Sequence, residues 1–257
     1  MMRFSGTVSL LLLAALMFSA AAHAQHSLCQ LSVRLESEQQ STAAGLHNDT
    51  RTSQQSYALL NALLAKAGCQ LRPQAFPAGR AIKMLEDGSL SIMVGMSKTA
   101  ERAAFSYFVG PHHVERMVVV GQREMQHNVS DLFQLLSWPG LISVTEGAYY
   151  GPKWQQLLQQ EQALQQRLFY ASGNQQKLAM LASNRVVATL EDETIVDELL
   201  LQQELALRYV KLFVLHENPV YFAISRKAVS KEQYLQLQQH WLQMQHSGEA
   251  DKIRQKF

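Results

Sequence analysis

The stretch Leu90-Ser-Ile-Met-Val-Gly-Met-Ser-Lys-Thr-Ala-Glu-Arg102 begins with a compact, mostly apolar run and then becomes polar. The apolar run, residues 90–94, predicts a buried strand. Ligands of open α/β sheets bind beyond the carboxyl ends of the strands, so the residues that follow are candidates for a site. A glycine that permits close backbone approach, two hydroxyls and a guanidinium suit a carboxylate: Gly95, Ser97, Thr99 and Arg102.

The segments around this strand alternate between strand and helix patterns. Strands at residues 31–35, 70–76 and 90–94 are separated by helices at 54–67 and 78–87. This β-α-β-α-β order favours a parallel sheet with right-handed crossovers.

The pattern starts again near Met117, which predicts a second α/β unit followed by a returning element. The expected strands are residues 117–120, 141–144, 186–190 and 220–225, and the expected helices are 129–137, 154–170, 174–183, 194–207 and 231–257.

The composition is that of a folded protein with a balanced charge. Of 257 residues, 47% are apolar and 17% are charged, and the net charge is +2. This balance argues against a protein whose main partner is nucleic acid or an anionic membrane surface.

The first 24 residues predict a secretory signal peptide that is cleaved after Ala24. Arg3 precedes an apolar run at residues 8–22, and Ala22-His23-Ala24 is an A-x-A cleavage signal. A membrane anchor and a lipoprotein acylated at Cys29 are the alternatives, but the run is short and Leu28 precedes the cysteine. The sequence therefore predicts a soluble, exported protein whose mature chain has 257 − 24 = 233 residues.

Export would place Cys29 and Cys69, the two cysteines of the chain, in an oxidising compartment. We expect a disulfide between them, with two buried, reduced thiols as the alternative. A bridge across 40 residues would stabilise the fold by roughly 4 kcal/mol in the chain-entropy model.

Two later strands are also followed by candidate site residues. Residues 145–151 form a glycine-flanked turn that contains Gly147, Tyr149 and Tyr150, and Asp192 lies in an acidic run that could receive an ammonium group. Each candidate has a structural alternative: Arg102 could pair with a surface carboxylate, Asp192 could cap a helix, and the tyrosines could be packing residues. Their joint placement beyond strand ends favours a site, because a site is made by convergent groups.

Residues 95–102 resemble the G-x-S-x-T-x-x-R segment of family 3 solute-binding proteins, the periplasmic amino-acid-binding proteins of ABC transporters. Residues 80–88, 144–151, 178–192 and 248–253 are similar to other segments of that family, so the resemblance covers essentially the whole mature chain.

The resemblance implies a type II periplasmic-binding-protein fold, in which two lobes with mostly parallel sheets flanked by helices are joined by two hinge strands. Lobe 1 would be residues 25–114 plus 219–257, and lobe 2 residues 115–218. By the family pattern, Arg102 would bind the α-carboxylate of a ligand with help from Ser97 and Thr99, and Asp192 would bind its α-ammonium. Glu36 and Glu38, which follow the first strand, hint at a ligand with an additional positive charge.

We therefore expect a monomeric binding protein without cofactor or metal that delivers a small zwitterion, such as an amino acid, to the membrane permease of an ABC importer. The adjacent His112 and His113 lack the partner spacing of a metal site. Two rivals stay open. One is an enzyme on the same fold, similar to cyclohexadienyl or arogenate dehydratases, with Glu191 or Glu193 as general acid. The other is a sensory input protein that acts on a membrane receptor in trans.

Overall fold

The computed structural model describes residues 29–35 and 51–257, and its strands form a single eight-stranded sheet in the order β2-β1-β3-β8-β4-β7-β5-β6. The predicted signal peptide, with Glu36 and Glu38, lies outside the described residues. Within the described part of the chain, no helix is long and apolar enough to cross a membrane.

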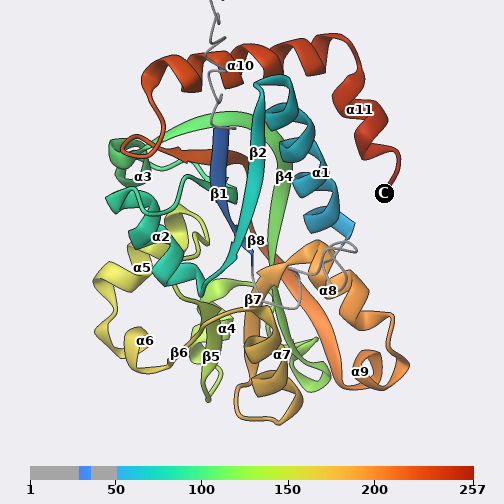
Figure 1. The fold of residues 1–257 in the computed structure, drawn as a ribbon. Helices are drawn as coiled ribbons and strands as arrows, with labels where there is room; N and C mark the ends of the chain where they lie inside the picture. Colours follow the sequence, from blue (N-terminus) through green and yellow to red (C-terminus); the bar gives the residue numbers. More distant parts are fainter. Residues whose placement is uncertain (1–28, 36–50) are drawn as a thin grey trace, which may run out of the picture.

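The first lobe is built around three parallel strands, as the sequence predicts. β1 (Cys29–Leu35) pairs with both β2 (Cys69–Ala75) and β3 (Ile92–Ser97). The helices of this lobe are α1 (Arg51–Lys66), α2 (Ala78–Asp87), α10 (Lys231–His246) and α11 (Glu249–Arg254), and Figure 1 shows α10 lying across the top of the sheet.

Two long antiparallel strands connect the lobes. After the short helix α3 (Ala100–Phe105), β4 (Ser106–Gln122) runs against β8 (Tyr209–Ser225) over its whole length. Figure 1 shows both strands passing from the upper to the lower half of the molecule. The fold is therefore the predicted two-lobed α/β fold with two hinge strands.

The second lobe continues the sheet with β7 (Ala188–Asp192), β5 (Ile142–Thr145) and β6 (Leu168–Ala171), of which the last two pair in parallel. Its helical elements are η2 (Arg123–Met125), α4 (Leu132–Ser137), α5 (Pro152–Gln160), α6 (Gln162–Gln166), α7 (Asn174–Ala182), α8 (Glu193–Leu200) and α9 (Gln203–Arg208).

Three expected helices are interrupted. The helix expected at 154–170 ends at Gln160, because Glu161 takes an extended conformation, and its last residues form β6. Pairing between β6 and β5 satisfies backbone groups along four residues, which outweighs the helical preference of this segment. The helix expected at 194–207 is divided near Leu201, and the C-terminal helix is divided at Gly248, whose φ of 72° suits glycine.

The two lobes have separate apolar cores. In lobe 1, α1 and α10 pack Leu59, Leu63 and Trp241 against the sheet, whereas lobe 2 buries Trp154, Leu135 and Ile142. The predicted disulfide between Cys29 and Cys69 is confirmed, and it joins residues that lie directly opposite each other at the start of β1 and β2. The bridge therefore fixes the outer strand pair of lobe 1.

Candidate functional site

A cavity of about 190 Å³ lies between the lobes. By the measure in which one water needs about 10–15 Å³, it is large enough for a small molecule. It is lined by residues of strands β1, β3 and β7, of both hinge strands, and of the first turns of α1, α7 and α8, including Arg34, Gly95, His112, His113, Glu115, Asn174 and Asp192.

Gly95 and Asp192 are the predicted site residues that line this cavity. Gly95 lies within β3, at a shift of its register against β8, and has a φ of 73°. A β-bulge with positive φ favours glycine because a side chain would be strained there. The bulge directs the N–H of Gly95 toward Nε2 of His112, 3.3 Å away.

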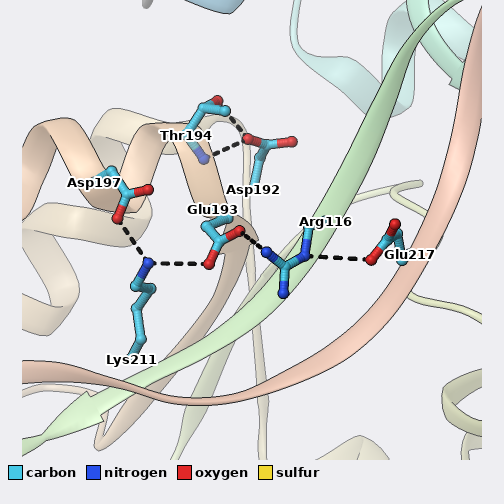
Figure 2. Close-up of polar contacts among 7 residues, drawn as sticks. All are labelled: Arg116, Asp192, Glu193, Thr194, Asp197, Lys211 and Glu217. Atoms are coloured by element: carbon cyan, nitrogen blue, oxygen red, sulfur yellow. Dashed lines mark hydrogen bonds and ion pairs between the residues drawn. The ribbon is translucent and has the colours of Figure 1, made fainter.

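Asp192 ends β7 and caps α8, so the structural role that the sequence offered for it is confirmed. Its Oδ1 accepts hydrogen bonds from the backbone N–H of Thr194, at 2.7 Å, and from the Thr194 hydroxyl (Figure 2). Among the described residues, none donates a hydrogen bond to its Oδ2. The carboxylate therefore combines a helix cap with an oxygen that a ligand can use.

Arg102, Ser97, Thr99 and Gly147 lie together, but they are not among the described residues that line this cavity. The guanidinium of Arg102 donates to the carbonyl oxygen of Ser97 at 3.0 Å and, across the lobes, to that of Gly147 at 2.8 Å. Thr99 caps α3 by accepting a hydrogen bond from the backbone N–H of Arg102. Burial lowers the pKa of Arg102, but an arginine stays protonated at any physiological pH.

The two tyrosines of the predicted turn differ in their surroundings. The ring of Tyr149 is partly exposed and packs edge-on against His216, with 5.5 Å between ring centroids. Tyr150 is buried in the core of lobe 2, and its hydroxyl accepts a hydrogen bond from the N–H of Thr145 at 2.7 Å. Tyr150 is thus a packing residue, whereas Tyr149 stays accessible.

The sequence interpretation missed Arg34 and Glu115, because it looked for ligand-binding residues only beyond strand ends, and it considered His113 only as a metal ligand. His113 and Glu115 are two residues apart in β4, so their side chains leave the same face of the strand. Burial, together with the nearby carboxylates of Asp192 and Glu191, raises the pKa of the Glu115 carboxyl to about 8, against the opposing charges of Arg102 and Lys177.

His112 is a buried, neutral histidine. Burial lowers its pKa to about 3. Since Nε2 accepts a hydrogen bond from Gly95, the proton lies on Nδ1, which donates to the Ser56 hydroxyl at 3.3 Å. The ring also stacks on Phe222. His112 thus joins β3, β4 and α1, and no group of three or more potential metal ligands occurs among the described residues.

The charged residues near Asp192 form two sets of ion pairs. Lys177 and Glu191 pair at 2.9 Å with side chains that are 1% and 4% exposed. On the other side of β4, Arg116 pairs with Glu193 at 2.7 Å and with Glu217 at 3.3 Å, and Lys211 joins Glu193 to Asp197 (Figure 2). This second set links both hinge strands to the start of α8, which carries Asp192.

Comparison with known proteins identifies one family. Residues 36–257 match the model of the bacterial extracellular solute-binding proteins, family 3. No curated protein matches the chain.

Several solved structures share the fold. A histidine kinase sensor domain with similarity to periplasmic binding proteins has a TM-score of 0.70 at 14% identity, over 88% of this chain and 95% of that chain. An ancestral arginine-binding protein bound to arginine has a TM-score of 0.69 at 17% identity, over 88% and 97%. A mutant of ArgBP from T. maritima has a TM-score of 0.68 at 14% identity, over 88% and 94%.

Proposed function

The chain belongs to family 3 of the bacterial extracellular solute-binding proteins, and we propose that it captures an amino acid in the interlobe cavity for an ABC importer. Membership of a solute-binding family supports a binding role. Neighbours described as arginine-binding proteins support an amino acid as the ligand.

The observation that carries this proposal is the presence of opposite charges around one small cavity. The guanidinium-bearing Arg34 and the N-terminal residue of α7, Asn174, line it together with the carboxyls of Asp192 and Glu115. Helix N-termini and arginine favour a carboxylate, and an aspartate favours an ammonium group. A zwitterion complements both kinds of group at once.

In this proposal Asp192 binds the α-ammonium through Oδ2, while its Oδ1 continues to cap α8. Arg102 does not line the cavity in this structure, so the ligand would have to extend from the cavity to its guanidinium. There Arg102 would bind the α-carboxylate, with Ser97 and Thr99 beside it, since two of its five N–H donors serve backbone carbonyls and three remain. Gly95, Gly147 and Tyr149 complete the surroundings of the ligand.

The lobes would be residues 25–114 plus 219–257 and residues 115–218, and they would close around the ligand by bending of β4 and β8. The hydrogen bond from Arg102 to Gly147 already joins the two lobes in this structure, and a closed state would keep it. Small-angle scattering would then give a smaller radius of gyration with ligand than without it, and an unchanged radius at saturation would argue against closure.

We further propose that the protein is exported, is cleaved after Ala24 and works in the periplasm as a monomer that meets a membrane permease. A sensory receptor is the alternative receiver, which the likeness to a histidine kinase sensor domain supports. Pull-down of membrane proteins with the mature protein would distinguish the two alternatives, because it would recover either the permease of an importer or a sensory receptor.

The enzyme rival is the weaker candidate because both of its predicted acids are engaged elsewhere. Glu191 is paired with buried Lys177, and Glu193 with Arg116 and Lys211. Neither of these glutamates is among the described residues that line the cavity. Formation of a product from arogenate would support the enzyme, and unchanged arogenate would support binding alone.

A thermal-shift screen of the mature protein against the common amino acids tests the proposed function. A ligand at about 100 times its dissociation constant adds about 2.7 kcal/mol to the free energy of unfolding. This raises the melting temperature by several degrees in a protein of this size. No shift with any amino acid would contradict the proposal.

A further inference from the structure

Two polar side chains of the cavity, His113 and Glu115, come from hinge strand β4 and not from a loop of either lobe. His113 and Glu115 line the cavity from one face of the strand, and Asp192 lines it from the end of the neighbouring strand β7, where it pairs with Met117. Glu115 makes no hydrogen bond or ion pair with another described residue. The Nε2 atom of His113 is buried and likewise has no hydrogen-bond partner in the described part of the chain.

Arg116, the next residue along β4, does have partners, so in this described segment only the side chains on the cavity face of the strand lack them. Arg116 points to the opposite face of β4, where Glu193 and Glu217 both pair with it (Figure 2). The same short segment thus pairs one charged side chain with two carboxylates and leaves its neighbour facing a cavity. An unpaired carboxyl at such a position is destabilising unless something else compensates it.

The charges that face Glu115 come from three elements, β7, α3 and α7. Asp192 and Glu191 of β7 repel a negative charge on it, and Arg102 of α3 and Lys177 of α7 attract one, while burial raises the pKa to about 8. The imidazoles of His112 and His113 have lowered pKa values because they are buried. Glu115 is therefore mostly protonated at neutral pH, and the histidines are neutral.

Resting on the function proposed above, we propose that the site takes a ligand with a second cationic group, which binds Glu115 while the first binds Asp192, and that Glu115 releases a proton as this happens. The cation replaces the proton as the partner of the carboxylate, and the proton passes to solvent. His113 adds a neutral ring nitrogen that serves the N–H groups of the same cation. A basic amino acid and a diamine share this chemistry.

Three related compounds separate these possibilities by calorimetric titration of the wild-type protein. L-Arginine carries both cations and a carboxylate, L-citrulline is its neutral-ended isostere, and agmatine lacks the carboxylate. We expect arginine to bind at least ten-fold more tightly than citrulline. Agmatine binding as tightly as arginine would assign the site to diamines, and weaker agmatine binding would assign it to amino acids.

Proton release is measured in the same titrations with two buffers of different ionisation enthalpy. A carboxyl with a pKa near 8 that becomes ionised on binding releases about 0.9 proton at pH 7. By the same linkage, the affinity for arginine rises about 50-fold from pH 6 to pH 8. Citrulline should show neither effect.

Glu115→Gln keeps the shape and the uncharged state of the side chain, so we expect it to abolish proton release and the preference for arginine over citrulline. Glu217→Gln is the matched control, because Glu217 pairs with Arg116 on the outer face and should change neither property.

Equal binding of arginine and citrulline without proton release would overturn the inference, and so would an unchanged preference in Glu115→Gln. Either result leaves the proposed function standing. Failure of every amino acid to bind would instead remove the proposed function, and this inference with it. The wild-type titrations decide the matter even where Glu115→Gln does not fold.

Discussion

The charged residues on the two sides of hinge strand β4 differ in their solvent exposure and in their partners. The outer network of Arg116, Glu193, Glu217, Lys211 and Asp197 is largely solvent-exposed, and each of its members has a partner. The inner charges lie in or beneath the cavity, where Lys177 and Glu191 are buried as a pair and Glu115 faces open space.

The difference indicates what each set does. Exposed ion pairs contribute little free energy, so the outer network serves mainly to hold the start of α8 against the hinge strands. A buried charge is costly without a partner, so the inner side chains must be satisfied by each other, by a proton or by a ligand. The inner set is therefore where changes should affect both stability and binding.

The largest effect is expected for Lys177→Met. It leaves the carboxylate of Glu191 buried without its 2.9 Å partner, and breaking a buried pair in this way lowers the free energy of unfolding by about 3–5 kcal/mol. Urea unfolding measures the loss. The double variant Lys177→Met, Glu191→Leu should recover most of it, and a double variant as unstable as the single one would contradict the account.

A smaller, pH-dependent effect is expected for Glu115 in the ligand-free protein. Because folding raises the pKa of Glu115 from 4.5 to about 8, its contribution to stability is complete below pH 4.5 and is lost as the pH rises through 8. Glu115→Gln should therefore gain stability relative to the wild type between pH 5 and pH 8, by about 3 kcal/mol. Melting temperatures across this range measure the gain, and a difference independent of pH would argue against it.

The smallest effect is expected in the outer network. Arg116→Met removes two ion pairs of a side chain that is 45% exposed, so the free energy of unfolding should fall by less than about 1 kcal/mol. The melting temperature should decrease by no more than a few degrees, and less at high salt, where exposed pairs are screened. A decrease in the free energy of unfolding as large as that of Lys177→Met would contradict the proposed difference between the inner and outer charges.

The two-lobed fold could be predicted because the helix and strand patterns of the sequence agree with the elements that the tertiary structure contains. The order of strands and helices up to Ser97 and the segment ending at Arg102 both pointed to it. The strand β6 was missed because residues 154–170 have helical spacing, and only pairing with β5 makes their last part a strand. Such pairing depends on residues far away in the sequence.

The site was predicted in part for a related reason. Asp192 and Gly95 follow or end core strands and were found on that basis, and both line the cavity. Glu115 lies in the middle of a 17-residue strand, where alternation gives half of the side chains to each face. The sequence does not show which face meets the other lobe, so the role of a hinge residue emerges only from the assembled fold.

The placement of the ligand ammonium at Asp192 is the central claim, and calorimetric titration of Asp192→Asn tests it most directly. Asparagine caps helices as well as aspartate does, so α8 should keep its start while the charge is lost. Since a charge-assisted hydrogen bond contributes about 1.5–3 kcal/mol, affinity for the amino acid with the largest thermal shift should fall about ten- to a hundred-fold. Asp197→Asn, in the outer network of the same helix, should bind normally. Wild-type affinity in Asp192→Asn, with an unchanged melting temperature, would contradict the account.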